Sequence, residues 1–223
     1  GLRVIDQSRI GPALLGDPFD LAGGPPVKAM LIQNTNPASV APDQTKVKQG
    51  LAREDLFVCV HEQFMTETAK FADIVLPATM FLEHDDVYQG GGHQHIMFGR
   101  KLVEAPGECR SNHDVICDLA RRLGAEHEGF TKTPRELIDW TLQHSRRPDL
   151  QKLDAENWID VQPDFETAHN LKRFGHPDGK FHFRPDWAKA AFLSPTGPLG
   201  PVKDMPEFPD HWGAIEEATE EYP

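Results

Sequence analysis

The sequence predicts an α/β protein of three layers, in which helices cover both faces of a mostly parallel sheet and an irregular, proline-rich extension follows. Three short apolar runs, at residues 27–32, 56–60 and 74–76, are each followed by polar or turn residues. Helix-forming segments lie between them, at residues 43–53 and 66–72. Alternation of strand and helix is typical of α/β folds. Strands that are apolar throughout are buried on both faces, which favours parallel pairing.

Each strand is marked by its boundaries as well as by its apolar residues. The first run, VKAMLI, begins after the turn-forming residues 23–26 (GGPP) and ends at the polar residue Gln33. The second run, LFVCV, is followed at once by a polar turn that starts at His61. The third, IVL, is stopped by Pro77, which cannot donate a hydrogen bond within a sheet.

Two further helices are predicted after the third strand. Apolar residues recur at helical spacing over residues 112–123, and Gly124 is suited to end that helix. The next helix begins at Pro134, because Thr133 and Glu136 have the spacing of a capping box. From these elements we expect an irregular lead-in at residues 1–26, an α/β domain at 27–145 and an irregular extension at 146–223. The extension includes short helices and one strand at residues 180–183, which follows the turn Asp178-Gly179.

Composition excludes several function classes. The 223 residues carry 23 Lys and Arg against 35 Asp and Glu, a net charge of −12, so we expect no nucleic-acid partner. No apolar run approaches the ~20 residues that cross a bilayer, so no membrane insertion is predicted. The three cysteines, Cys59, Cys109 and Cys117, form no C-x-x-C pair and favour a reducing, cytoplasmic location. Motifs for a P-loop, a standard dinucleotide site and a serine hydrolase are absent.

Polar loops follow the first two strands, where an open parallel sheet binds its ligands. Asparagine side chains, threonine hydroxyls and loop N–H groups in these loops could bind a phosphate or a ribose. The competing interpretation is that the same residues only cap turns and helices. The candidate binding residues are Asn34, Thr35, Asn36 and Pro37 in the first loop and His61, Glu62, Thr66 and Thr68 in the second.

Residues 83–95 combine three glycines with histidines and carboxylates. Glycine permits a ligand to approach the backbone closely, so we expect this segment to be a loop that touches a ligand. The residues that a metal enzyme could use are His84, Asp85, Asp86, His93 and His95. Their spacing places no complete ligand set, so no metal site is predicted. No residue stands out as a catalytic nucleophile, and no catalytic residue is predicted.

Taken in order, several motifs of the chain resemble those of one family. Asn34-Thr35-Asn36-Pro37 follows the first strand, and residues 57–69 (FVCVHEQFMTETA) contain the second strand and its loop. Residues 72–78 (ADIVLPA), Glu83, Pro106-Gly107 and the helix end LARRLG at 119–124 complete the series. This series resembles the molybdopterin oxidoreductases of the dimethyl sulfoxide reductase and formate dehydrogenase type. The match covers about residues 25–125 and is similar to their third domain, which binds the guanosine end of one molybdopterin guanine dinucleotide.

The resemblance implies roles for the predicted loops. Asn34, Asn36 and Pro37 would hold the phosphates or the guanosine. Glu62 stands where relatives commonly carry Asp and would accept a hydrogen bond from the ribose or guanine, with Thr66 and Thr68 completing the pocket. The loop at residues 90–95 departs from the family pattern, so no role passes to its two histidines.

Much of the family pattern is missing, so the chain is interpreted as one part of a molybdenum or tungsten oxidoreductase that is inactive alone. The cysteine cluster of an iron–sulfur centre would belong to a missing N-terminal part, and nothing here matches the family's metal ligand. The partners implied are the remaining domains or subunits, including a C-terminal barrel. The alternative is a non-catalytic interaction or nucleotide-binding module, in which scattered aromatic residues after residue 146 contact a partner.

Overall fold

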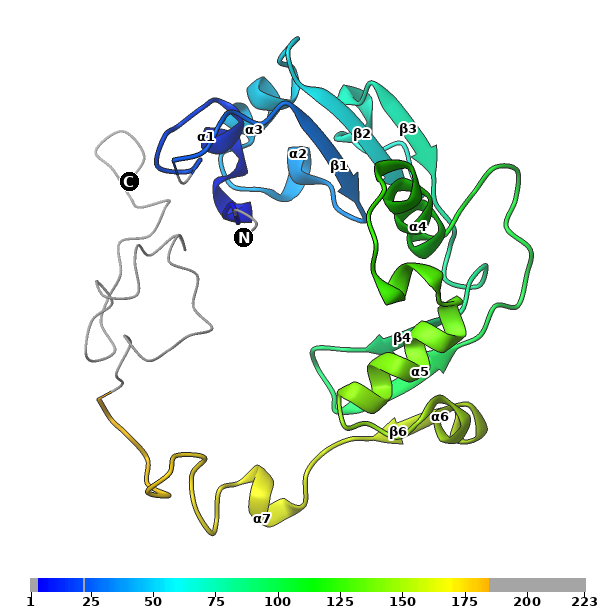
Figure 1. Cartoon of the computed structure of the whole chain (residues 1–223). Coiled ribbons are helices and arrows are strands. Elements are labelled where there is room, and N and C mark those ends of the chain that lie inside the picture. The colour runs from blue at the N-terminus through cyan, green and yellow to red at the C-terminus, as the bar shows by residue number, and fades with distance from the viewer. Residues whose placement is uncertain (1–3, 22, 185–223) are drawn as a thin grey trace.

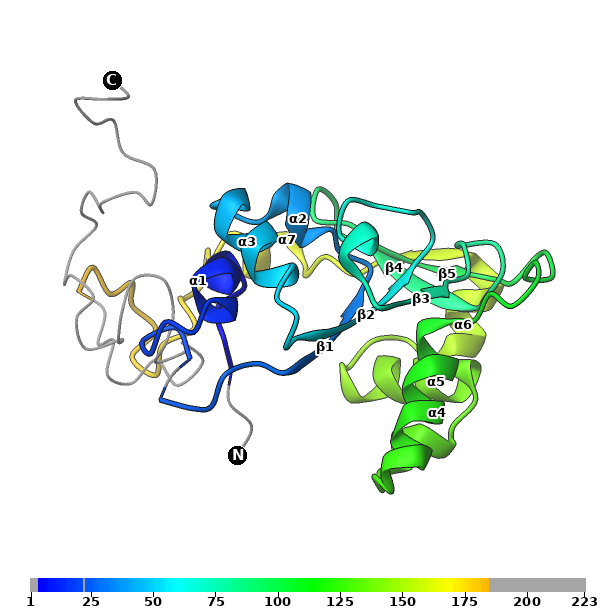
Figure 2. The same cartoon turned by 90° about the horizontal axis from the view of Figure 1, so that it is seen from above.

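The computed structural model describes residues 4–21 and 23–184. It contains two three-stranded sheets, one parallel and one antiparallel, which occupy separate parts of the molecule (Figure 1). The same view turned by 90° shows the helices α1, α2 and α3 grouped beside the parallel sheet and α4, α5 and α6 on the other side (Figure 2). None of the helices in this described part combines the length and apolar character that a membrane span requires.

The parallel sheet is formed by the three apolar runs of the sequence. Its strands are β1 (Ala29–Gln33), β2 (Phe57–Glu62) and β3 (Ile74–Pro77), in the order β1-β2-β3. In the register, Leu31 pairs with Cys59, which pairs with Ile74. The α/β prediction is therefore confirmed. β1 is an edge strand, and no described strand pairs along its outer side.

One face of this sheet is closed by three short helices. They are α1 (Ile10–Leu14), α2 (Pro37–Val40) and α3 (Gln44–Leu51). The hydrophobic core between sheet and helices consists mainly of Leu14, Ile32, Ala38, Val47, Leu51, Leu56, Val58 and Val60.

The expected irregular lead-in therefore contains a helix that belongs to the core. A Cβ added to Gly50 would lie 2.5 Å from the Cβ of Leu14, so glycine is what lets α3 approach α1. The sequence signal for α1 is weak because the helix has only five residues, one of which is proline. A 3-10 turn, η1 (Gln7–Arg9), leads into it.

Among the described residues, α4 (Asn112–Leu123) is the element that covers the opposite face of the sheet. A groove of about 700 Å³ lies between α4 and the sheet, and its lining includes Leu31, Phe57, Cys59, Val115 and Leu119. Burial raises the pKa of the Cys59 thiol. Helices thus lie on both faces, as predicted, but the described residues leave this face partly open.

The second sheet was not predicted. Its strands are β4 (Asp86–Gln89), β5 (His95–Gly99) and β6 (Trp158–Asp160), all antiparallel. The glycine-rich stretch expected to be a loop is therefore a hairpin, with only residues 90–94 as its connection. Buried and exposed residues alternate along β5, but its central residues Ile96, Met97 and Phe98 are all apolar, so the sequence shows no alternation of polar and apolar residues there.

A second core lies under the antiparallel sheet. Two helices pack on it, α5 (Pro134–His144) and α6 (Leu150–Glu156). The boundary expected after residue 145 falls inside this core, because α6 and β6 pack against α5 and β5. Its buried residues are Ile96, Phe98, Ile138, Leu142, Leu150 and Leu153.

The helix boundaries predicted for α4 and α5 are confirmed. Ser111 caps α4 by accepting a hydrogen bond from the N–H of Asp114, and Gly124 ends it with φ of 67°. Thr133 and Glu136 form the predicted capping box of α5. Short 3-10 turns, η2 (Ala69–Phe71) and η3 (Glu128–Thr131), occur elsewhere.

After β6 the chain extends away from both sheets (Figure 1). It includes α7 (Phe165–Ala168), and residues 162–178 are exposed. The predicted turn at Asp178-Gly179 is present, with Gly179 at φ of 71°, but residues 180–183 form no strand. No neighbouring strand is available to pair with them among the described residues. The expected proline-rich tail after residue 184 lies outside the described residues.

Candidate functional site

A polar cavity of about 380 Å³ lies at the carboxyl ends of the three parallel strands. Asn34 and Gln63 come directly after β1 and β2, and Thr79 is the second residue after β3. All three line the cavity. This edge is where open α/β sheets bind ligands. The remaining wall is formed by Phe81, His84, Asp85, Asp86, Tyr88, Ser111, Asn112, His113 and Pro134.

Asn34 is the one predicted binding residue that lines this cavity. Its side chain is exposed, and its backbone has φ of 54°, in the left-handed region. Asparagine tolerates that region better than most residues, at a cost that glycine would avoid. A strained residue at the end of a strand is a frequent feature of binding sites.

Asn36 and Thr68 join the two predicted loops to each other. The amide oxygen of Asn36 accepts hydrogen bonds from the hydroxyl of Thr68 at 2.7 Å and from its N–H at 3.1 Å. The hydroxyl of Thr68, fully buried, in turn accepts from the N–H of Ala38 at 3.0 Å. These contacts use the amide oxygen, so the NH₂ group is the part of Asn36 that a ligand could still engage.

His61 lies in the interior with both ring nitrogens bonded. Its Nδ1 accepts from the amide of Gln33 at 3.1 Å, and its Nε2 donates to the carbonyl of Arg110 at 3.1 Å. His61 therefore connects the ends of β1 and β2 to the segment that starts α4. In this arrangement the ring positions the cavity wall at residues 111–113 rather than facing a ligand.

The other predicted residues have varied surroundings. Glu62 is half-buried, and one of its carboxylate oxygens accepts the N–H of Gln63 at 2.7 Å. The hydroxyl of Thr66 accepts the N–H of Ala69 at 3.2 Å and starts η2. Pro37 is buried as the first residue of α2, and Thr35 is half-buried between the loop asparagines.

The far wall of the cavity belongs to the segment between the two sheets. Thr79 and His84 are hydrogen-bonded through Oγ1 and Nδ1 at 2.8 Å, and the carboxylate of Asp86 lies 3.8 Å from His84 Nε2. The ring of Tyr88 lies across Gly99, where a Cβ would come within 2.3 Å of it. Burial, with a smaller effect of Asp86, raises the pKa of the Tyr88 phenol.

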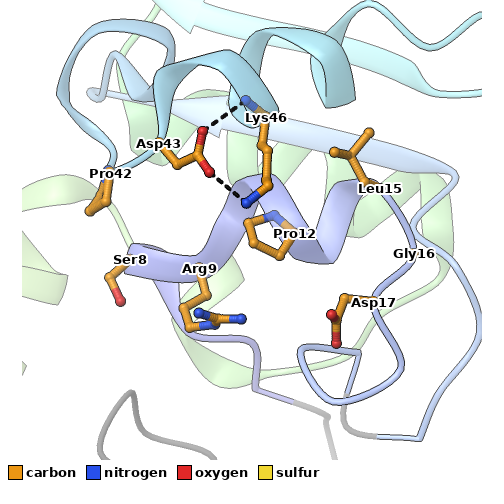
Figure 3. A pocket seen from close by; sticks show the side chains of 9 residues that line it. All are labelled: Ser8, Arg9, Pro12, Leu15, Gly16, Asp17, Pro42, Asp43 and Lys46. Carbon is orange, nitrogen blue, oxygen red and sulfur yellow. Dashed lines mark hydrogen bonds and ion pairs between the residues drawn. The ribbon is translucent and has the colours of Figure 1, made fainter. Parts of the chain in front are cut away.

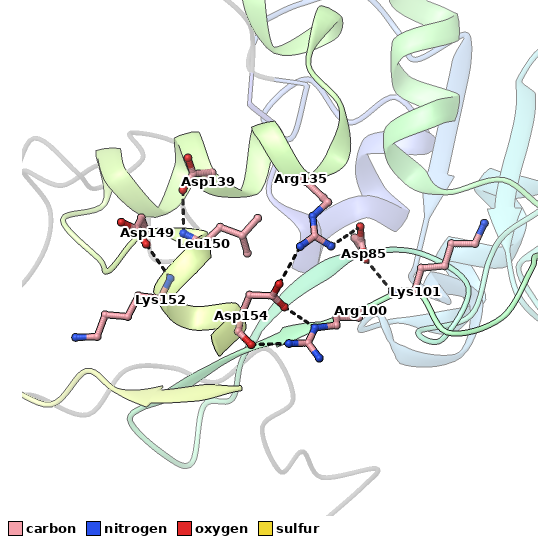
Figure 4. Close-up of polar contacts among 9 residues, drawn as sticks. All are labelled: Asp85, Arg100, Lys101, Arg135, Asp139, Asp149, Leu150, Lys152 and Asp154. Carbon is pink, nitrogen blue, oxygen red and sulfur yellow. Dashed lines mark hydrogen bonds and ion pairs between the residues drawn. The ribbon is translucent and has the colours of Figure 1, made fainter. Parts of the chain in front are cut away.

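Asp85 is held by an ion-pair network on the antiparallel unit (Figure 4). Its carboxylate accepts the N–H of Lys101 at 2.8 Å and faces Arg135 at 3.4 Å. Arg135 also contacts Asp154 at 3.1 Å, and Arg100 pairs with the same carboxylate. The network anchors the cavity wall to α5 and α6.

The histidines of the hairpin lie apart from those of the cavity. His93 and His95 have ring centroids 5.6 Å apart, and His95 packs edge-on against Trp158 at 5.0 Å. His84 and Asp86 instead line the cavity. Across residues 4–21 and 23–184, no three His, Cys, Asp or Glu side chains are grouped to hold a metal ion.

A larger cavity, of about 750 Å³, lies between α1 and the start of α3 (Figure 3). Its cationic side chains are paired within the protein: Lys46 with Asp43 at 2.7 Å, and Arg9 with Asp20 at 2.6 Å. None of the predicted binding residues lines it. Size alone therefore does not make it the better candidate site.

Sequence reasoning missed most of the cavity wall. Gln63 and Thr79 could have been found, because each follows a predicted strand closely. Asn112 and His113 open a helix whose start was predicted. Tyr88 had no comparable signal, because its strand was not recognised.

Comparison with known proteins shows which family the residues around this cavity match. Residues 19–122 match the family model described as molybdopterin oxidoreductase. This part of the chain belongs to the molybdopterin oxidoreductase family. Its matched residues contain the parallel sheet, both predicted loops, α4 apart from its last residue, and all of the cavity wall except Pro134.

Alignments with individual relatives are longer than the 19–122 match. The probable oxidoreductase YoaE of Bacillus subtilis is 42% identical over 155 residues, which are 70% of this chain and 22% of that protein. The probable oxidoreductase YyaE of the same organism is 30% identical over 196 residues, 87% of this chain and 26% of that protein. The chain thus spans about a quarter of the length of these relatives.

A solved structure has a similar fold. Acetylene hydratase from Pelobacter acetylenicus superposes with a TM-score of 0.59 and 26% identity, over 82% of this chain and 25% of that chain. Family membership implies a pterin cofactor that carries molybdenum or tungsten. The polar side chains that line the cavity fit the organic part of such a cofactor, whereas the described residues offer no cluster of metal ligands.

Proposed function

We propose that this chain forms part of a molybdenum- or tungsten-dependent oxidoreductase and binds the guanosine end of a molybdopterin guanine dinucleotide. The observation that carries the proposal is the cavity at the carboxyl edge of the parallel sheet, where residues from three strand ends converge. The loops at residues 34–37 and 61–68 border the same edge. When bound, the cofactor would supply transfer of oxygen atoms or electron pairs.

In this proposal, the chain's own residues bind and orient one nucleotide. The NH₂ group of Asn36 and the first N–H groups of α4 donate hydrogen bonds, and Asn34 and Gln63 offer amide groups that donate and accept. The net charge of −12 does not attract an anionic cofactor from a distance, so affinity depends on these local donors. The metal ligand and the iron–sulfur cluster would be held by parts of the enzyme outside these 223 residues.

The proposed partners are the remaining domains or subunits of the enzyme, in the cytoplasm. The three cysteines are unpaired, which supports a reducing compartment. The open face of the parallel sheet, with Leu31, Phe57 and Ile74 each about 40–50% exposed, supports a partner surface. This observation also favours the alternative of an interaction module, which predicts self-association of the chain in sedimentation experiments. A monodisperse monomer would count against it.

The experiment that tests nucleotide binding is calorimetric titration of the 223-residue chain. Guanosine 5′-monophosphate should bind more tightly than adenosine 5′-monophosphate. Asn36→Ala should lower the affinity, because it removes a donor and releases Thr68, whereas Gln143→Ala on the exposed side of α5 should change nothing. Equal, weak binding of both nucleotides would contradict the proposal.

A further inference from the structure

The charges around the cavity indicate which part of a nucleotide cofactor it can hold. Two carboxylates, Asp85 and Asp86, line it, and neither lysine nor arginine is among its described lining residues. A phosphate placed there would face two carboxylates, and Arg135, the cation beside Asp85, is already paired with Asp85 and Asp154. The cavity is therefore suited to an uncharged group that donates hydrogen bonds.

The two carboxylates differ in what they can still bind. Asp85 is already engaged by the N–H of Lys101 and by Arg135. Asp86 accepts only the N–H of Val87 through Oδ1 at 2.7 Å, and its Oδ2 lies 3.8 Å from His84 Nε2, beyond hydrogen-bond length. The side chain of Asp86 is 47% exposed. Asp86 is thus the acceptor that remains open to a ligand.

Aromatic side chains flank this acceptor. Phe81 is 57% exposed at the cavity, and the ring of Tyr88 lies two residues from Asp86 on the same face of β4. Residues at this spacing on one strand project in the same direction. A flat ring could pack on these side chains while its edge faces the carboxylate.

We propose that Asp86 selects the heterocycle of the bound cofactor, by accepting hydrogen bonds from a ring edge with two adjacent N–H donors while Phe81 supports the ring. Guanine and pterin share this edge, whereas adenine places a ring nitrogen acceptor there, which a carboxylate disfavours. The inference rests on the proposed function and differs from the family-based expectation in one respect. The acceptor is Asp86 and not Glu62, which already accepts the N–H of Gln63 and does not line the cavity.

The test compares two carboxylate substitutions with a matched control in the 223-residue chain. Asp86→Asn, Glu62→Gln and Glu104→Gln each remove one negative charge, and Glu104 is an exposed residue outside the cavity. Each variant is titrated calorimetrically with guanosine 5′-monophosphate, neopterin and adenosine 5′-monophosphate, after circular dichroism has verified its fold. We expect Asp86→Asn to lower affinity for guanosine 5′-monophosphate, neopterin or both by about tenfold or more and to leave adenosine 5′-monophosphate unchanged. Glu62→Gln and Glu104→Gln should resemble the wild-type chain.

The outcomes separate this inference from the proposed function. In one outcome, Asp86→Asn still prefers guanosine 5′-monophosphate to adenosine 5′-monophosphate, and Glu62→Gln has lost that preference. This outcome would overturn the inference and leave the proposed function intact. Binding of neopterin alone, sensitive to Asp86→Asn, would support the inference and replace the guanosine end by the pterin. Binding of neither compound by the wild-type chain would overturn both. As a second measurement, Phe81→Ala should weaken the same ligand as Asp86→Asn, and an unchanged affinity would contradict the ring support.

Discussion

The two faces of the parallel sheet are made by the same three strands but have opposite surroundings. On one face, Val58 and Val60 are completely buried under α1, α2 and α3. On the other, Leu31 is 39% and Phe57 is 47% exposed beside the groove under α4. Within residues 4–21 and 23–184, these apolar strands are thus closed over on one side only. The apolar character of the open face is what a sheet covered on both faces requires, and the described residues supply that cover on one face.

The largest expected effect separates the two faces directly. Val58→Ala should lower the free energy of unfolding by about 2–3 kcal/mol, because it leaves a cavity in a closed core. Leu31→Ala, which deletes more atoms from the neighbouring strand, should cost less than about 1 kcal/mol, because that side chain is already in contact with solvent. Urea denaturation followed by circular dichroism measures both. Equal losses would mean that the groove is closed in solution.

A second substitution tests how tightly the closed face is packed. Gly50→Ala places a methyl group 2.5 Å from the Cβ of Leu14 and should destabilise the chain by about 1 kcal/mol or more, despite the higher helix propensity of alanine. Gly91→Ala in the hairpin loop meets no atom within 4 Å and serves as the control. Thermal unfolding of the two variants provides the comparison. An unchanged Gly50→Ala midpoint would show that α1 is not packed firmly on α3.

At the carboxyl edge of the parallel sheet, the Asn36–Thr68 contact should have an intermediate effect on the free energy of unfolding. Thr68→Val keeps the shape of the side chain but leaves the N–H of Ala38 and part of the Asn36 amide without a partner. We expect a loss of about 1–2 kcal/mol in urea denaturation. Thr141→Val removes an exposed hydroxyl that bonds within α5 and should be neutral. If both variants behaved alike, the Asn36–Thr68 contact would not be formed in solution.

Acid should affect the antiparallel unit through Asp154. The hydrogen bond from Arg100, aided by Arg135, holds the pKa of Asp154 below its usual range (Figure 4). A carboxyl with a lowered folded-state pKa stabilises the fold above its unfolded value of about 3.9, and this contribution is lost as the pH falls through the folded pKa. Asp154→Asn should therefore make stability less dependent on pH below about 4. Stability curves as steep as those of the wild-type chain at low pH would exclude this role.

The smallest effect on stability is expected on the open face. Leu119, on α4, is 41% exposed, so Leu119→Ser should leave the unfolding midpoint nearly unchanged. The same change should reduce the fluorescence of bound anilinonaphthalene sulfonate, which binds exposed apolar surface. Undiminished dye fluorescence would place the exposed apolar surface elsewhere on the molecule.

What the sequence predicted depends on how local each signal is. The parallel strands, the start and end of α4 and the capping box of α5 are encoded by neighbouring residues, and all were predicted. The antiparallel strands were not, because β4 and β5 show no regular alternation of polar and apolar residues and because β6 lies some sixty residues further along the chain. The five-residue α1 is stabilised by packing on α3 rather than by its own sequence.

The sequence indicated the region of the polar cavity better than it indicated the residues that line it. The strand ends pointed to the edge of the sheet where the cavity lies, and Asn34 lines that cavity. His61, Asn36 and Thr68 have polar side chains in the expected loops, yet much of their hydrogen-bonding capacity is used inside the protein. A buried histidine with two internal partners has the same sequence appearance as a ligand-binding one. Only the fold distinguishes the two.

The outer edge of β1 has a consequence for handling the chain in the laboratory. Ala29–Gln33 carries no charged residue and offers its backbone groups on one side without a described strand beside it. Such an edge is a template for intermolecular strand pairing. Concentrated solutions of this chain are therefore expected to form oligomers whose abundance rises with concentration, through main-chain hydrogen bonds that side-chain substitutions on the open face would not remove.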